Sequence, residues 1–170
     1  INLSFQQKSK NIEMQGLVGY TYANPTAIHP NAVIGIDNNN NQQTYLNTSS
    51  DTTGYVLKYR PQHMAKADVM ITYKKWTLGL GAAYQSRVQN IDVAFVSFPI
   101  GLFIPGIQTS IDETLTAYTL VNARIGYVFT NRWKTNMIVS NLANTEYAIR
   151  PADLGAPRSV RLQVTYTLDK

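Results

Sequence analysis

The run from Val160 to Leu168 alternates apolar and polar side chains without a break, and it constrains the fold more than any other part of the chain. A period-two pattern of this kind predicts a β-strand with one apolar and one polar face. Six further segments show the same alternation, at about residues 1–6, 12–23, 62–73, 76–85, 119–129 and 133–142. The sequence therefore predicts an all-β chain of about seven antiparallel strands.

The connections between these strands alternate in length. Residues 7–11, 74–75 and 130–132 are short turns, whereas residues 24–60, 88–118 and 143–158 are long loops. In an up-and-down meander, alternate connections lie at the same end, so the short turns gather at one end and the long loops at the other. Outer-membrane β-barrels have this asymmetry. No stretch approaches the ~20 apolar residues that a membrane-spanning helix needs.

Aromatic residues occupy both ends of the predicted strands, and they suggest two membrane-interface girdles. Hairpin geometry places Tyr73 opposite Trp76, and Phe129 opposite Trp133. The two rows are separated by roughly 8 to 10 residues, close to the ~9 to 11 that cross a bilayer. A general preference of aromatic residues for strands is the alternative explanation. The row beside the short turns contains Phe5, Tyr73, Trp76, Phe129, Trp133 and Tyr166, and the other row contains Tyr20, Tyr22 and Tyr84.

The polar strand face carries charges of both signs, which favours a wet lumen or a plug domain over lipid. Facing lipid at mid-depth, each charge would cost about 2 to 4 kcal/mol. Small residues on this face, such as Gly79, Gly81 and Gly126, are expected to let another body approach closely. The alternative is the solvated outer surface of a soluble β-sandwich. The expected lumen-facing charges are Glu13, Lys66, Asp68, Arg124, Lys134 and Arg161.

Composition excludes several functional classes. The charged fraction is only 15%, and the net charge of +5 comes from scattered residues, so nucleic acid is not an expected partner. The chain has no cysteine, hence no disulfide and no thiolate metal site. His29 and His63 lack a metal-ligand spacing, and no catalytic set or phosphate-binding loop is evident. We therefore expect no enzyme activity, no cofactor and no metal.

Two loop segments have distinctive compositions. Residues 37–43 read Asp-Asn-Asn-Asn-Asn-Gln-Gln and predict a solvated, mobile turn. Residues 95–107 are unusually apolar for a loop. They are expected either to bury their own side chains, to pack over a barrel mouth or to contact a ligand.

The last third of the chain resembles the C-terminus of TonB-dependent outer-membrane receptors. The resemblance rests on Asn141, Leu142, Asn144 and Tyr147 in an Asn-Leu-x-Asn-x-x-Tyr segment, on Pro157-Arg158-Ser159, and on the alternating final strand. Residues 59–63, Tyr-Arg-Pro-Gln-His, resemble an earlier barrel segment more weakly. The resemblance implies residence in the bacterial outer membrane, an antiparallel up-and-down transmembrane barrel of roughly 22 strands, and import of a ferric siderophore, haem, cobalamin or an oligosaccharide.

The resemblance also implies partners. Residues 1–170 would form about seven C-terminal strands of a larger barrel, whose plug domain and earlier strands lie outside this chain. One of those strands is expected to pair with the final strand. The missing N-terminal region would couple to the inner-membrane TonB complex, and the barrel wall would contact outer-membrane lipid and lipopolysaccharide. The chain ends Leu168-Asp169-Lys170 rather than on an aromatic residue, so recognition by the barrel-assembly machinery would depend on Tyr166.

Ligand contacts are expected at the outer rim. Arg87, Tyr147, Arg150 and Arg158 lie there, where arginine side chains suit anionic chelates. Solvated rim charge and contact with lipopolysaccharide are equally consistent with these positions. A passive porin or structural barrel, and a soluble β-sandwich binding module, are the alternative functions.

Overall fold

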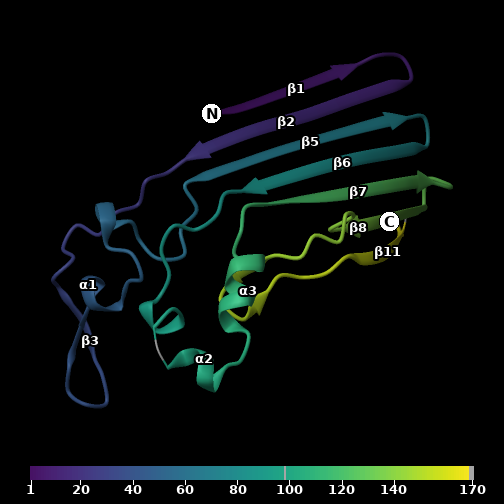
Figure 1. Cartoon of the computed structure of the whole chain (residues 1–170). Coiled ribbons are helices and arrows are strands. Elements are labelled where there is room, and N and C mark those ends of the chain that lie inside the picture. Colours follow the sequence, from purple (N-terminus) through teal and green to yellow (C-terminus); the bar gives the residue numbers. More distant parts are fainter. Residues whose placement is uncertain (98, 169–170) are drawn as a thin grey trace.

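A computed structural model of the chain describes residues 1–97 and 99–168. Seven long strands form one antiparallel sheet, a meander in which every strand pairs with the next long strand of the chain (Figure 1). The sheet order is β1-β2-β5-β6-β7-β8-β11. The bounds are β1 Asn2–Lys8, β2 Ile12–Tyr22, β5 His63–Tyr73, β6 Trp76–Gln85, β7 Tyr118–Val128, β8 Trp133–Ser140 and β11 Ser159–Tyr166.

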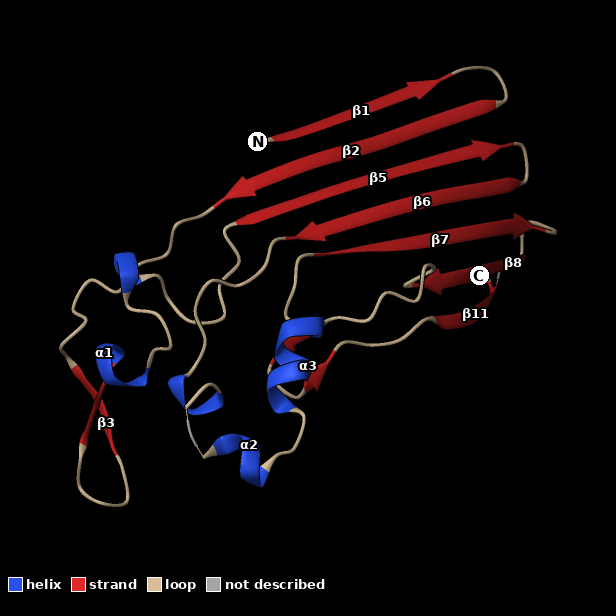
Figure 2. Cartoon of the chain, in the orientation of Figure 1, coloured by secondary structure: helices blue, strands red, loops and turns tan. Residues whose placement is uncertain are grey.

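The observed strands confirm the sequence prediction, because each begins and ends within two residues of the predicted bounds. The short turns gather at one end of the sheet and the long loops at the other, as Figure 2 shows. The two-residue turn after β5 uses Lys74 in a left-handed conformation, with φ 53°. Tyr73 pairs with Trp76 across this turn.

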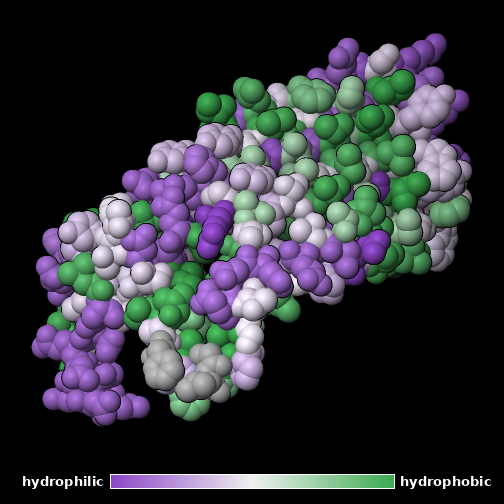
Figure 3. Space-filling view, viewed as in Figure 1, coloured by the Kyte–Doolittle hydropathy of each residue, from purple (hydrophilic) through white to green (hydrophobic). Residues whose placement is uncertain are grey.

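The apolar face of the sheet lies bare in the described part of the chain. Leu80 in mid-sheet is 56% exposed, and Leu162 on β11 is 67% exposed. Figure 3 shows hydrophobic surface spread over the sheet, while the tip of the β3–β4 hairpin is hydrophilic. A soluble sandwich would cover this face with a second layer, and none of the described residues does so. The alternative of a soluble sandwich is therefore wrong, and the expected barrel-type sheet is the fold.

Both edges of the sheet are open among the described residues. β1 pairs only with β2, and β11 pairs only with β8. The expected partner strand beside β11 therefore stays a prediction.

The long loops contain secondary structure of their own. The first holds β3 (Val33–Ile36), β4 (Gln42–Thr44), α1 (Tyr45–Thr48) and the 3₁₀ helix η1 (Thr53–Tyr55). The second holds the 3₁₀ helix η2 (Val93–Phe95), α2 (Ile100–Phe103) and α3 (Ile107–Thr114), and the third holds β9 (Ala148–Arg150) and β10 (Asp153–Leu154). Among the described residues, no helix combines the length and apolarity needed to cross a membrane.

The Asn-rich segment forms the solvated turn that its composition predicts. It closes the β3–β4 hairpin, and the Asp37 carboxylate accepts hydrogen bonds from the backbone of Asn39 and Asn41 and from the side chains of Asn41 and Gln43. These bonds lower the pKa of Asp37, the Asn41 side-chain bond most strongly. The Asp37 side chain therefore closes this exposed turn.

Candidate functional site

The three long loops join into one body at the end of the sheet, which we call the loop body. Its apolar centre takes residues from the second and third loops, and Tyr59 of the first loop packs against it. The expectation that the apolar segment 95–107 buries its own side chains holds only in part: Ile107 is buried and Phe95 and Ile100 pack against the centre, whereas Val96, Phe103 and Ile104 are 44%, 77% and 42% exposed. The centre consists of Val88, Ile91, Ile107, Ile111, Leu115 and Ala148.

Asn90 of the second loop forms hydrogen bonds with the first loop. This role was not predicted from the sequence. Its side chain is 1% exposed. Its Nδ2 donates to Tyr45 Oη at 3.0 Å and to the Val56 carbonyl at 2.8 Å. Its Oδ1 accepts from Ser50 Oγ and from the Asp51 backbone. All four side-chain bonds cross between loops, so Asn90 fixes how the loops pack together.

Asp92 forms a second link between loops. Its Oδ1 lies 2.5 Å from Lys58 Nζ, and its Oδ2 accepts from Tyr59 Oη at 2.6 Å. Arg150 of the third loop lies over the Tyr59 ring, 5.1 Å from the centroid. Burial raises the pKa of Asp92, but hydrogen bonds from Lys58 and Tyr59 outweigh it, and the net pKa is lowered. Burial and the Asp92 bond raise the pKa of Tyr59 to about 12.

The segment that resembles the receptor family has a structural basis. Asn141 and Asn144 have left-handed backbones, with φ 50° and 54°, a conformation that asparagine tolerates better than most residues. Asn141 is 4% exposed, and its Nδ2 donates to the carbonyls of Thr145 and Ala156. Its Oδ1 accepts from the Thr145 backbone, and Asn144 Oδ1 accepts from the Arg158 backbone. The two asparagines therefore shape the third loop.

Tyr147 completes this loop as a packing residue. Its ring lies 4.4 Å from that of Tyr118, centroid to centroid. On Gly155, an added Cβ would lie 2.0 Å from a carbon of the Tyr147 ring, so only glycine fits there. A pocket of ≈ 750 Å³ opens between α3 and the third loop, and Tyr147 and Gly155 are among its lining residues.

The structure does not bring the four predicted rim residues into one cavity. Tyr147 lines the pocket beside α3, whereas Arg87 lines a smaller one of ≈ 140 Å³. The Arg150 side chain stacks on Tyr59, and Arg158 is exposed. Ligand contact by these residues stays a prediction.

Register places the six predicted lumen charges on one face of the sheet, which we call the polar face. Arg124 Nη2 bonds both oxygens of Asp68, at 2.6 and 2.7 Å, across the intervening strand β6. Gly79 and Gly81 make room on β6: an added Cβ would lie 2.7 Å from Arg124 at the first and 2.7 Å from Asp68 at the second. The expectation that these glycines leave space for another body is therefore wrong. Side chains of neighbouring strands occupy that space.

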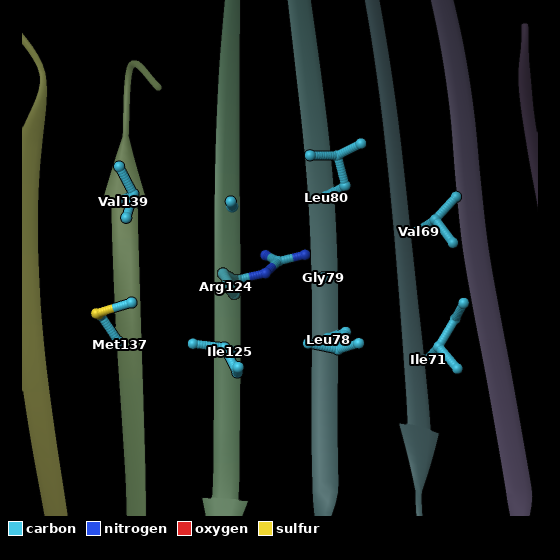
Figure 4. Close-up of a pocket in the computed structure, with 10 residues that line it drawn as sticks. Val69, Ile71, Leu78, Gly79, Leu80, Arg124, Ile125, Met137 and Val139 are labelled. Carbon is cyan, nitrogen blue, oxygen red and sulfur yellow. The ribbon is translucent and has the colours of Figure 1, made fainter. Parts of the chain in front are cut away.

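The apolar face carries a shallow hollow of ≈ 320 Å³ over β6, β7 and β8. Figure 4 shows aliphatic side chains around it, including Leu78, Ile125 and Met137. Arg124 and Gly79 also border the hollow, but the Arg124 side chain belongs to the opposite, polar face, where it bonds Asp68. The aliphatic lining of the hollow suits contact with hydrocarbon.

The predicted girdle residues share this apolar face, and they follow a sloping line. Levels on different strands can be compared through the residues that pair across the sheet. On this measure Phe5 lies four residues farther from the short-turn end than the Tyr73–Trp76 pair, and Tyr166 lies two residues closer to that end than the pair. The line therefore climbs six residues over the six steps from β1 to β11. At ~3.3 Å per residue and ~4.8 Å per strand, the slope is about 35°. Transmembrane barrel strands tilt by ~35 to 45°.

Ring contacts follow the same line. The ring centroids of Trp133 and Tyr166 are 4.7 Å apart, and those of Trp76 and Tyr127 are 4.5 Å apart. Tyr127 was not among the predicted girdle residues. At the loop end, Tyr20 Oη lies 2.8 Å from His63 Nδ1. Tyr84 lies eight residues from Trp76 along β6, which is ~26 Å along the strand and about 22 Å in height at a 35° tilt. The apolar band of an outer-membrane barrel is ~25 Å tall.

Comparisons with known proteins agree with this architecture. The family described as TonB dependent receptor-like, beta-barrel, matches residues 1–142. The vitamin B12 transporter BtuB of Vibrio cholerae serotype O1 is 24% identical over 123 residues, covering 71% of this chain and 18% of that protein. The chain thus spans about a fifth of the length of the curated relatives it matches.

The solved structure of FpvA shows the same fold. P. aeruginosa FpvA, in a complex with a heterologous pyoverdine and iron, aligns with a TM-score of 0.51 and 14% identity, over 96% of this chain and 19% of that chain. The ferric-catecholate import receptor Fiu from K12 E. coli aligns with a TM-score of 0.47 and 14% identity, over 96% and 26%. The family match ends where the Asn141 segment begins, so the earlier strands carry it. The chain belongs to the TonB-dependent receptor β-barrel family, whose members are receptors and transporters rather than enzymes.

Proposed function

We propose that this chain forms part of the wall, the lumen lining and the outer loops of a TonB-dependent outer-membrane importer. The sloping aromatic line carries the proposal. Its ~35° slope matches barrel strands that cross a membrane, and a soluble sheet has no reason to align its aromatic residues at that angle. Family membership supports the same conclusion.

On this proposal, the apolar face contacts outer-membrane lipid, and the two aromatic rows lie at its interfaces. The polar face lines a lumen that a plug domain fills. The plug and the remaining strands belong to the rest of a longer protein, because this chain spans only about a fifth of its relatives. Those strands pair with β1 and β11, since a bilayer does not tolerate open sheet edges.

The loop body lies on the extracellular side, where long barrel loops are found. It presents its pockets and its arginines to the ligand, and the exposed rim charges contact lipopolysaccharide. The barrel-assembly machinery recognises the final strand through Tyr166 and its apolar neighbours. Residues 169–170, which end the chain beyond this strand, lie outside the described residues.

The ligand is a scarce molecule that a passive pore would not concentrate. FpvA was solved with a pyoverdine and iron, and BtuB carries vitamin B12 in its name. Ferric siderophores, cobalamin, haem and oligosaccharides are the candidates to test.

The experiment is accumulation of these labelled candidates by cells that express the full-length gene product. Accumulation of one of them above the external concentration is expected, and deletion of the TonB protein should abolish it while leaving the barrel in the outer membrane. A passive porin would equilibrate its solute equally well in both strains. A protein recovered from the soluble fraction without detergent would overturn the proposal at its first step.

A further inference from the structure

We infer that the pocket between α3 and the third loop binds a polar ligand that carries an ammonium group beside hydroxyls, such as an amino sugar. The inference rests on the proposed function, because it assigns a ligand class to the outer loops of the importer. The pocket measures ≈ 750 Å³, within the ~300 to 1,000 Å³ of small-molecule sites.

The first wall of this pocket is one side of α3. Ile107, Ile111 and Leu115 follow one another at four-residue spacing and are buried in the loop-body centre, at 3%, 4% and 4% exposure. The helix is therefore anchored by that side. Ser110 and Glu113 line the pocket from the remaining surface of the helix.

The opposite wall is equally well anchored. The hydrogen bonds of Asn141 and Asn144 fix the path of the third loop. Tyr147 lies against Gly155 and Tyr118, and Thr145 Oγ1 donates to the Thr119 carbonyl at the end of the sheet. The pocket is therefore formed before a ligand arrives, and little ordering of loops opposes binding.

The charged side chains that line the pocket are all acidic in the described part of the chain. Glu113 and Glu146 both line the pocket, and no lysine, arginine or histidine is among the described residues that do. The chain as a whole carries a net charge of +5, so this local excess of negative charge runs against the composition. An anionic ligand would meet two carboxylates of its own sign, whereas an ammonium group would meet two complementary charges.

The lining also offers acceptors that the protein leaves open. Within the described part of the chain, the half-buried Ser110 Oγ and the exposed carboxylates of Glu113 and Glu146 have no hydrogen-bond or ion-pair partner. Asn144 and Thr145, by contrast, already bond to the loop backbone. The open groups are oxygens, which suit a ligand rich in N–H and O–H donors. This class differs from the anionic chelates that the rim arginines led us to expect.

The test is equilibrium binding to the purified full-length protein in detergent at about pH 6. The probes are the glucosamine trimer, which carries ammonium groups, and its fully N-acetylated counterpart, which is neutral. We expect the glucosamine trimer to bind roughly tenfold more tightly, with an affinity that falls as salt is raised.

Two variants make the assignment specific. The double variant Glu113→Gln/Glu146→Gln keeps the shape of the pocket and should weaken binding of the glucosamine trimer about tenfold. Asp112→Asn is the matched control. Asp112 lies on the same helix as Glu113, and its replacement removes one negative charge, but its carboxylate accepts from Gln108 Nε2, and Asp112 lines the other, smaller pocket. It should bind the trimer like wild type.

The inference is overturned if the double variant binds the glucosamine trimer like wild type, if both trimers bind equally, or if Asp112→Asn weakens binding as much as the double variant does. Failure of the proposed function has a different signature, because it would abolish TonB dependence in cells and leave these binding constants unchanged.

Discussion

Replacing Asn141 tests whether the receptor-like segment is a structural device. The side chain makes three hydrogen bonds with the third-loop backbone, two with the carbonyls of Thr145 and Ala156 and one with the Thr145 amide. At about 1 kcal/mol each, their loss destabilises the local loop structure by about 3 kcal/mol. Asn141→Ala also places a less tolerant residue at φ 50°, at a cost of about 1 kcal/mol more.

The measurement is hydrogen exchange at the Thr145 amide of the full-length protein in detergent. This amide donates to Asn141 Oδ1 at 2.8 Å, so it reports directly on the missing acceptor. A loss of about 3 kcal/mol corresponds to exchange faster by roughly a hundredfold. Asn141→Gly removes the same bonds without the backbone cost, so the difference between the two variants isolates that cost.

Asn131→Ala, in the short turn at the opposite end of the sheet, is the control and should leave Thr145 unaffected. If Asn141→Gly leaves the Thr145 amide as protected as in wild type, the bonds do not hold the loop, and the argument from the buried asparagine is refuted.

Three further predictions use other parts of the molecule. Leu80→Arg on the apolar face should lower barrel stability in liposomes by about 2 to 4 kcal/mol, whereas Gln163→Arg on the polar face should change it little, and equal denaturation midpoints would contradict the lipid assignment. The pKa of Asp92 is lowered, so its stabilisation is present above the ordinary aspartate value and disappears as pH falls through the folded pKa. Asp92→Asn should remove that acid-sensitive step from limited proteolysis of the loop body, and an unchanged step would assign it to another group. Gly155→Ala places a methyl against the Tyr147 ring and should abolish binding of the glucosamine trimer while folding of the barrel, measured by its gel mobility without heating, is retained; retained binding would show that the ring is free to move.

The sheet was predictable because each strand has one lipid-type and one polar face, and this requirement appears in the sequence as alternation. The meander then follows from the alternating connection lengths. Even the less regular β8 keeps the pattern where it pairs with β11, with Trp133 opposite Tyr166 and Met137 opposite Leu162. Register could be predicted only beside the tight turns, because turn geometry fixes it there.

The loop body was not predictable to the same degree. Ile107, Ile111 and Leu115 lie at helical spacing, a signal that the assignment of an irregular loop overlooked. Asn90 gave no signal, since nothing in its neighbours distinguishes a buried asparagine from a solvated one. The strand glycines were recognised as small residues, but the side chains that cover them come from neighbouring strands, and only the register reveals those.

The shared centre of the loop body limits how such loops can be exchanged between proteins. The second and third loops bury side chains against each other, so a chimera that replaces only one of them would open a hole beneath α3. The β3–β4 hairpin is different, because Val33, Ile34 and Ile36 are 50%, 66% and 63% exposed and its turn is closed by its own Asp37. That hairpin is the natural place to insert an epitope or a fluorescent tag, and the other two loops are best transplanted together.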